Sequence, residues 1–297
     1  MRSHKAFTMI ELIFVIVIMG IIGKFGVEFL AQTYKNFIFS SVNNSLQSKS
    51  AMAVEFIATR LQYRIKDSLI ARVNTGTNAV GIGSATGSTY TVLEWVAMDI
   101  DGYRGSTTPN WSGIADLDAG EALGTIVSPQ TQTNKINELI TILSDGSKDI
   151  NDTALYFIGS NSDVTLDYGW DANITNQYAA MHPINSNTDF TQFAPALGTG
   201  TFEGVTLYEY YKLAWTAYAV VNRDADGDGD DDLVFYYDYQ PWNGDTLADA
   251  KQSMIMEDVS TFQFTAIGSI IKIQVCAATD LIKSEDKYSL CKEKTIF

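Results

Sequence analysis

The stretch from residue 224 to residue 232 concentrates oxygen ligands that suit a hard cation. Asp224, Asp226, Asp228 and Asp232 stand at relative positions 1, 3, 5 and 9, and Gly229 stands at position 6. Ca²⁺ binds about six to eight oxygen atoms, and alternate aspartates on a tight turn that glycine permits can supply several of them. Six aspartates among nine residues also repel one another unless a cation neutralises them. We therefore predict a Ca²⁺ site in this loop; the alternative is a solvated acidic hairpin turn.

The flanks of this loop argue against an EF-hand. An EF-hand needs a glutamate at its twelfth position, where this chain has Phe235, and both flanks have the composition of strands rather than helices. The loop instead resembles the D-x-D-x-D-G-x-x-D hairpin sites of integrin-type repeats. By that resemblance the four aspartates named above contribute side chains and Asp230 contributes a backbone carbonyl.

The two cysteines lie close together near the carboxyl terminus. Cys276 ends the run SIIKIQVC and Cys291 lies in YSLCKEKTIF, and both runs have strand character. A disulfide between them would close a loop of about 16 residues and contribute about 3 kcal/mol on the chain-entropy model, if the two strands lie side by side. Two free buried thiols are the alternative.

Residues that could carry catalysis are few. The chain has two histidines, His4 and His182, which excludes a multi-histidine metal site, and we expect His182 to be a polar surface residue of a loop. It has no G-x-S-x-G, phosphate-loop or H-E-x-x-H motif. Glu94 and Glu209, each beside aromatic residues, are expected on strand surfaces. We therefore expect no enzymatic activity and no catalytic residues. The formal net charge of −15 argues against nucleic acid as a partner.

A lone carboxylate stands near the start of an apolar run. In KAFTMIELIFVIVIMGIIG, residues 5–23, Glu11 is the only charged residue after Lys5. Such a group costs about 2.5–3.5 kcal/mol at the centre of a bilayer, so a partner for it is expected. The run predicts a transmembrane helix at residues 7–30, because residues 7–23 alone make a helix of about 26 Å, slightly short of a hydrocarbon core. No small-residue cleavage site of a secretory signal follows it, and a plain anchor does not explain Glu11.

The residues KA-FTMIEL resemble the processing site of type IV prepilins and type II secretion pseudopilins. The resemblance implies a leader at residues 1–6, cleavage between Ala6 and Phe7 by a prepilin peptidase, and N-methylation of Phe7. Ala6 stands where most members have glycine. Glu11 is then the fifth residue of the mature chain, and its implied role is to pair with the Phe7 ammonium of a neighbouring subunit. Pairing would offset the cost of placing both charges in a low-dielectric core.

The resemblance also implies a location and partners. It places the protein in the bacterial inner membrane, with other pseudopilins, the inner-membrane assembly platform and the prepilin peptidase as partners. The basic residues Arg2 and Lys5 before the span, and the acidic bulk after it, orient the amino terminus towards the cytoplasm and the head towards the periplasm.

A second helical segment is predicted at residues 31–76. No proline occurs between residues 7 and 75, and apolar residues recur at three- and four-residue steps, at Val54, Ile57, Leu61, Ile65, Leu69 and Val73. The pattern places Arg60, Arg64 and Asp67 on other, solvated faces. A helix that continues from the span without a break would be about 90–100 Å long. A break near residues 47–50 is the alternative.

Residues 77–297 have the composition of a β-rich head. The stretch 74–90, rich in glycine, serine and threonine, is predicted as a linker or long loop, residues 151–204 mostly as loops, and NKINELITILSDG as a short helix. Runs of β-branched and aromatic residues predict strands in YTVLEWVAM, ALYFIGS, LAWTAYAVV, LVFYYDY, STFQFTAIG, SIIKIQV and YSLCKEKTIF. The fold class is therefore α+β, a long amino-terminal helix packed on an antiparallel β-rich head, which is the arrangement of a pilin.

These features and the resemblance predict a structural minor pseudopilin of a type II secretion or type IV pilus-like system, at or near the tip of a short filament. A head of about 220 residues is about 45 Å across, which is bulky for a subunit packed on all sides. The alternative is a single-pass membrane-anchored binding module for an exported protein or glycan. Glu11 separates the two, because we expect a monomeric anchor to have no use for it.

Overall fold

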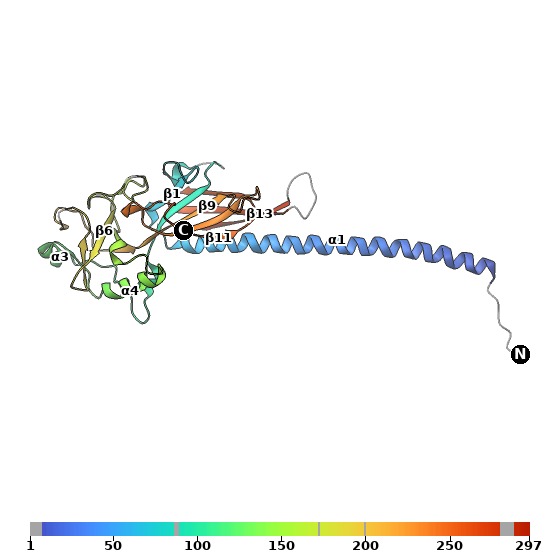
Figure 1. Ribbon diagram of the computed structural model, residues 1–297, viewed down its shortest axis with the longest axis horizontal. Helices are drawn as coiled ribbons and strands as arrows, with labels where there is room; N and C mark the ends of the chain where they lie inside the picture. Colours follow the sequence, from blue (N-terminus) through green and yellow to red (C-terminus); the bar gives the residue numbers. More distant parts are fainter. Residues whose placement is uncertain (1–7, 86–88, 172, 199, 280–287) are drawn as a thin grey trace.

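A single long helix projects from a β-rich head (Figure 1). The computed structural model describes residues 8–85, 89–171, 173–198, 200–279 and 288–297. Helix α1 spans Met9–Gln62 and is continuous over its 54 residues, about 80 Å. The break considered near residues 47–50 is absent from it, and the predicted combination of a long helix and an antiparallel β head is confirmed.

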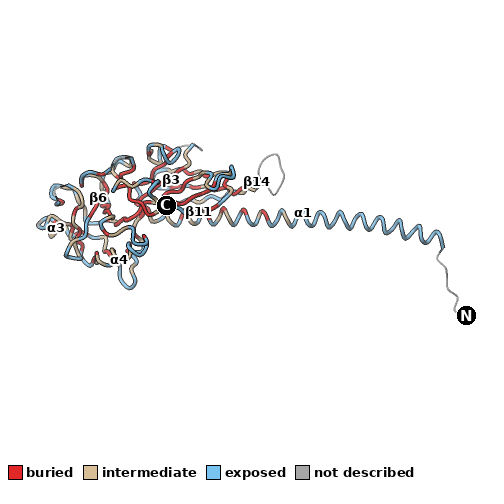
Figure 2. Tube along the Cα trace, viewed as in Figure 1, coloured by how far each residue is buried: buried red, intermediate tan, exposed pale blue. Residues whose placement is uncertain are grey.

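The last third of α1 packs on the head through one face. Its buried residues begin at Val42 and recur at three- and four-residue steps: Val42, Leu46, Ser50, Ala53, Val54, Ile57, Ala58 and Leu61. Towards the amino terminus the helix is exposed on all sides (Figure 2). The amphipathic pattern is thus confirmed for the part of the helix that touches the head.

The helix ends at Gln62, earlier than the sequence pattern predicted. Residues Lys66–Ser68 form the 3-10 turn η1, and Ile70–Arg72 form strand β1. Ile65 and Leu69 are buried as their spacing suggested, but the backbone nitrogen of Ile65 donates to Val96 O at 3.0 Å, at the edge of strand β3. The chain pairs with β3 instead of continuing the helix, because this pairing satisfies backbone N–H and C=O groups of β3 that would otherwise lack hydrogen-bond partners.

The central sheet has six antiparallel strands in the order β11-β10-β9-β3-β1-β2. Its remaining strands are β2 (Val80–Gly81), β3 (Val92–Ala97), β9 (Thr216–Arg223), β10 (Asp232–Tyr239) and β11 (Lys251–Met256). All of β3 is buried because both faces of the sheet are covered. Leu93 and Trp95 belong to the core that includes α1, whereas Val92 and Val96 belong to a second core under the loops on the opposite face.

A three-stranded antiparallel sheet completes the core around α1. It consists of β12 (Val259–Ile267), β13 (Ile270–Thr279) and β14 (Tyr288–Ile296), in that order. Ile273 and Val275 of β13 share one hydrophobic core with Ile57 of α1 and Trp95 of β3. All the runs predicted as strands in this part of the chain are strands.

A distal lobe lies beyond the carboxyl-terminal end of α1, at the end of the molecule opposite to the amino terminus (Figure 1). Its five-stranded sheet has the order β4-β7-β6-β5-β8. The lobe contains α2 (Ile100–Arg104), α3 (Leu117–Leu123), β4 (Ile126–Val127), α4 (Thr133–Leu143), η3 (Ile150–Asp152), β5 (Ala154–Phe157), β6 (Met181–Ser186), β7 (Gln192–Pro195) and β8 (Tyr211–Ala214). The short helix predicted in NKINELITILSDG is confirmed as α4.

Two predicted loop regions contain regular structure. Strands β6 and β7 lie within residues 151–204, and the stretch 74–90 contains β2 and the 3-10 turn η2 (Ile82–Ser84). The segments MHPINS and QFAP hold prolines and few β-branched residues, so their strand propensity is weak. Pairing with β5, where Ala154 lies opposite Pro183, makes a strand of β6.

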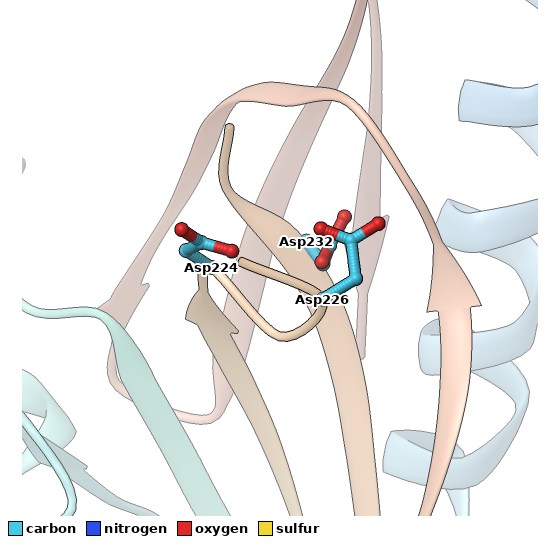
Figure 3. A group of neighbouring side chains, drawn as sticks. All are labelled: Asp224, Asp226 and Asp232. Carbon is cyan, nitrogen blue, oxygen red and sulfur yellow. The ribbon is translucent and has the colours of Figure 1, made fainter. Parts of the chain in front are cut away.

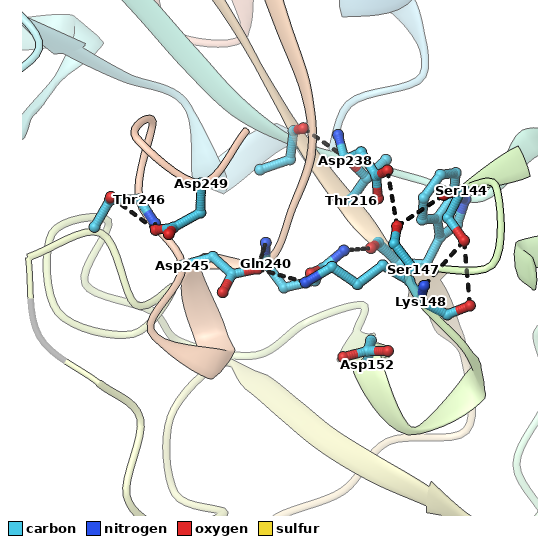
Figure 4. A network of polar contacts seen from close by, with 12 residues as sticks. Ser144, Ser147, Lys148, Asp152, Thr216, Asp238, Gln240, Asp245, Thr246 and Asp249 are labelled. Atoms are coloured by element: carbon cyan, nitrogen blue, oxygen red, sulfur yellow. Dashed lines mark hydrogen bonds and ion pairs between the residues drawn. The ribbon is translucent and has the colours of Figure 1, made fainter. Parts of the chain in front are cut away.

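A polar network fastens the distal lobe to the central sheet (Figure 4). Lys251 Nζ contacts Asp238 Oδ2 at 2.7 Å and donates to Ser144 O at 2.8 Å, after α4. Lys148 Nζ lies 2.7 Å from Asp245 Oδ2, close to the 3-10 turn η4 (Pro241–Asn243). The buried carboxylate of Asp238 thus has a cationic partner, which offsets its desolvation.

Candidate functional site

The two residues of the predicted processing site, Ala6 and Phe7, lie outside the described residues. The first described residue, Thr8, is the N-cap of α1, and Glu11 lies in the first helical turn. Glu11 Oε2 accepts hydrogen bonds from Thr8 N at 3.1 Å and from Thr8 Oγ1 at 3.0 Å, while Glu11 N donates to Thr8 Oγ1 at 3.4 Å. These bonds form a capping box, so Glu11 has a local partner in addition to any partner in a neighbouring subunit.

The helix that follows exposes a long apolar surface. None of the residues from Met9 to Ser41 is buried, a length of about 50 Å. The apolar stretch of α1 is long enough to cross a membrane, and none of its residues is buried against the head. A hydrocarbon core needs about 30 Å, so a span leaves further exposed helix before the head. Tyr34 and Phe37 lie in that remainder and are 66% and 69% exposed.

The acidic loop connects β9 to β10 and divides its aspartates into two groups. The first group consists of Asp224, Asp226 and Asp232 (Figure 3). Each of them has a carboxylate oxygen within 4.8 Å of those of the other two. Two ligands of one Ca²⁺ are at most about 5 Å apart, so these three can share an ion. The second group consists of Asp228, Asp230 and Asp258. The sequence indicated the aspartates of the loop itself but not Asp258, which comes from the turn between β11 and β12.

Backbone amides already contact several of these carboxylates. Asp224 accepts from Gly227 N at 2.6 Å and from Gly229 N at 3.2 Å, and Asp232 Oδ2 accepts from Ala225 N at 3.0 Å. Gly227 and Gly229 have φ angles of 86° and 97°, which L side chains rarely adopt. The glycines therefore allow the turn in which their amides reach the carboxylate of Asp224.

The cysteines form a disulfide between the two carboxyl-terminal strands. Cys276 of β13 lies directly opposite Cys291 of β14 in the antiparallel register, and the sulfur atoms are bonded. The alternative of two free thiols is wrong.

Three polar residues that the sequence placed at the surface are buried. His182 is 3% exposed in β6, beside the ring of Phe157, and burial lowers its pKa to about 4. Glu94 is 2% exposed, because β3 is covered on both faces. Arg64 is 2% exposed and donates to Leu61 O at 2.7 Å, since the chain turns into the sheet at this point instead of continuing as a helix. Glu209 is exposed as predicted, but it lies in a bend before β8 and not in a strand.

Glu94 belongs to a buried ion pair that sequence reasoning missed. Arg72 Nε donates to Glu94 Oε1 at 2.8 Å, and Arg72 Nη1 donates to Asp171 Oδ1 at 2.6 Å. The pairing of β1 with β3 brings the two side chains together, because Ile70 lies opposite Glu94. A helix through residue 72 would not have done so. The pair is structural, since each charge compensates the desolvation of the other.

Comparison with known proteins identifies the amino-terminal segment. Residues 1–23 match the family model of the prokaryotic N-terminal methylation motif. The chain therefore carries a prepilin-type motif followed by a long apolar helix and an α+β head of pilin-like architecture. This combination supports a pilin-type or pseudopilin-type protein that is processed by a prepilin peptidase and anchored in a membrane. No curated protein and no solved structure matches the chain.

Proposed function

We propose that this protein is a structural minor pseudopilin of a type II secretion or type IV pilus-like system, assembled at or near the tip of a short filament. The observation that carries the proposal is the prepilin-type motif on a helix whose apolar surface from Met9 to Phe37 is exposed, with contacts to the head beginning only at Ile38 and Phe39. A membrane can cover only about 30 Å of that surface. Helices of neighbouring subunits, packed side by side, would cover the whole of it.

The place of the distal lobe supports a position at the tip. The lobe extends past the end of α1, away from the amino terminus (Figure 1). A subunit stacked above this one would meet the lobe, whereas the shaft of the helix below remains open to neighbours. The proposed orientation has the amino terminus in the cytoplasm and the head in the periplasm, and the proposed partners are other pseudopilins and the inner-membrane assembly platform.

Ca²⁺ is proposed as a structural ligand of the acidic loop. The support is geometric: Asp224, Asp226 and Asp232 converge on one point, and Asp228, Asp230 and Asp258 converge on another. A cation at either point would relieve the repulsion among like charges. The role is stabilisation of the head, and no enzymatic activity is proposed.

A single-pass membrane-anchored binding module is the second candidate. The capping box favours it, because the bonds between Thr8 and Glu11 give the carboxylate a use within one chain. Glu11 therefore separates the two functions less sharply than the sequence indicated.

Processing tests the proposal directly. Mass spectrometry of the protein from the membranes of its own host should find an amino terminus at Phe7 that carries a methyl group. An intact Met1 terminus would contradict the pseudopilin assignment. Cross-linking in the same membranes should join α1 to other pilin-like subunits; a processed protein that cross-links to none of them would favour the binding module.

A further inference from the structure

A pocket of about 260 Å³ opens on the distal lobe, and no residue of α1 or of the acidic loop lines it. Its walls are α3, the turn into β4, and the segment of residues 202–207. Pockets for small molecules and cofactors usually measure about 300–1,000 Å³, so this one is small for such a ligand. Its size suits one or two side chains of a bound polypeptide.

The floor of the pocket is apolar and fixed in place. Ile126 and Phe202 are buried beneath it, and Leu117 and Leu207 are half-buried at its sides. Phe202 N donates to Gly124 O at 3.0 Å, which ties the two walls together. A Cβ on Gly120 would lie 2.6 Å from Thr125 O, so only glycine lets α3 approach this turn. The pocket is therefore preformed.

The lining carries negative charge without a counter-ion. Asp116, Glu121 and Glu203 line the pocket, and no lysine, arginine or histidine is among its lining residues. Glu121 and Glu203 are exposed, and neither forms an ion pair within the described parts of the chain. The carboxylate of Asp116 caps α3 through Ala119 N at 3.1 Å.

Apolar walls with carboxylates at the opening match one kind of side chain. Lysine and arginine lay their aliphatic stems along apolar surfaces and keep their charged ends at the polar edge. Arginine is also enriched among the anchors that fill preformed pockets at protein interfaces. An acidic or neutral side chain would leave the carboxylates without compensation, and repulsion would disfavour an acidic one.

We propose that this distal pocket binds a segment of another protein that presents an arginine or lysine flanked by apolar residues. A second copy of this chain is an unsuitable source, because two chains with a formal net charge of −15 repel each other. Several of its own lysines are also engaged in ion pairs, among them Lys49, Lys148, Lys251, Lys272 and Lys294. Helix α3, one wall of the pocket, lies at the end of the molecule opposite to the amino terminus of α1, where an external partner can reach it (Figure 1). The proposal concerns the head surface and does not depend on processing at Phe7.

The test uses the full chain in phospholipid nanodiscs and immobilised synthetic peptides. The probe peptide holds a single arginine between two leucines, within a glycine-serine spacer. One companion peptide has glutamate in place of the arginine, and another has serines in place of the leucines. The arginine-leucine peptide should bind most tightly, and its affinity should fall as salt is added.

Matched variants locate the binding. Glu121→Gln with Glu203→Gln should weaken the probe about twofold to thirtyfold, since exposed charge pairs contribute about 0.2–1 kcal/mol each. Glu138→Gln with Glu257→Gln removes the same charge from exposed residues elsewhere and should leave affinity unchanged. Val205→Arg places a cation in the lining of the pocket and should abolish binding.

Three results with the peptides would overturn the proposal. They are no detectable binding of the arginine-leucine peptide, equal binding of the glutamate companion, and equal weakening by the two pairs of substitutions. Self-association of the chain that the Glu121→Gln, Glu203→Gln variant abolishes would assign the pocket to a second copy, and would also overturn it.

Discussion

Thr8 and Glu11 hold each other at the start of α1, where the carboxylate of Glu11 accepts from both the amide and the hydroxyl of Thr8. The carboxylate therefore provides both a hydrogen-bond acceptor for the cap and a negative charge, and a substitution can remove the charge while it keeps the acceptor. Glutamine can complete a capping box as well as glutamate can. The charge is needed only if an ammonium group from a neighbouring subunit approaches.

The first prediction concerns the charge of Glu11 in assembly. Glu11→Gln should keep the cap and insert into the membrane normally, but it should reduce co-purification with other pilin-like subunits, because the ammonium loses its partner. Thr8→Val removes the hydroxyl of the cap and keeps the charge, so it should assemble nearly as well as the wild type. Quantitative cross-linking in membranes measures both. Normal assembly of Glu11→Gln with failure of Thr8→Val would reduce Glu11 to a capping residue.

The second prediction concerns Ca²⁺. A cation that binds only the folded state at about a hundredfold excess over its Kd adds about 2.7 kcal/mol, so the full chain should melt several degrees higher in Ca²⁺ than in chelator. Mg²⁺ should have a smaller effect, because it requires tighter octahedral geometry. Asp226→Asn and Asp230→Asn each remove one member of a different triad and should each reduce the Ca²⁺ increment.

Asp231→Asn is the control for this measurement. Asp231 lies in the same loop but its side chain accepts from Asn222 Nδ2 at 2.8 Å and belongs to neither triad. It should keep the full increment. A melting temperature indifferent to Ca²⁺ and chelator would show the loop to be an acidic turn.

The third prediction concerns the disulfide. Cys276 and Cys291 are 15 residues apart in the chain, so the bond should contribute about 3 kcal/mol on the chain-entropy model. Cys276→Ser with Cys291→Ser should lower the free energy of unfolding by about that amount, and reducing agent should have no further effect on that variant. An alkylation assay on the unreduced wild type should find no free thiol; two reactive thiols would refute the bond.

The buried pair of Arg72 and Glu94 gives the fourth prediction. Glu94→Ala leaves the buried guanidinium with the carboxylate of Asp171 and the carbonyls of Thr77 and Trp170, and should cost about 3–5 kcal/mol in denaturant unfolding. The exposed pair of Lys272 and Glu293 is the matched comparison, and Glu293→Ala should cost at most about 1 kcal/mol. Similar losses for the two variants would contradict a special role for burial.

The fifth prediction concerns pH. Burial raises the pKa of Asp99 to about 6 from 3.8, although Gly102 N and Trp111 Nε1 donate to its carboxylate. Between pH 3.8 and about pH 6 the folded state then binds more protons than the unfolded state. The stabilisation of the folded state by the protonated Asp99 is therefore present below pH 3.8 and is lost as pH rises to about 6. Burial lowers the pKa of His182 from 6.5 to about 4, so its contribution is present above pH 6.5 and is lost as pH falls towards 4.

Asp99 lowers the free energy of unfolding as pH rises from about 4 to about 6, whereas His182 raises it over the same range. Asp99→Asn keeps an N-cap and an acceptor for Trp111 but cannot titrate, so it should reveal the increase of stability with pH that His182 causes. The wild type should show a flatter profile in urea melts over the same range. Identical profiles for the two proteins would mean that Asp99 titrates normally.

The sequence by itself determined the amino-terminal features and most of the strands. The prepilin-type motif, the apolar helix and the face of α1 from Val54 to Leu61 follow from local residue types and spacing. The strands rich in β-branched and aromatic residues were found because their composition suits a buried pleated sheet. The aspartate spacing of the acidic loop was equally local, since one tight turn brings residues 224, 226 and 232 together.

Only the tertiary structure decided where α1 ends and which polar groups are buried. Residues 63–72 keep a helical apolar spacing, yet hydrogen bonds to β3 turn the chain out of the helix and place strand β1 between β3 and β2. The same contact buries Arg72 with Glu94, and the two-sided cover of β3 could not be read from its own residues. Asp258 joins the acidic loop, and the distal pocket forms, because separate segments meet in space. Long-range pairing leaves no periodic signal in a short window of sequence, so propensity alone does not reveal it.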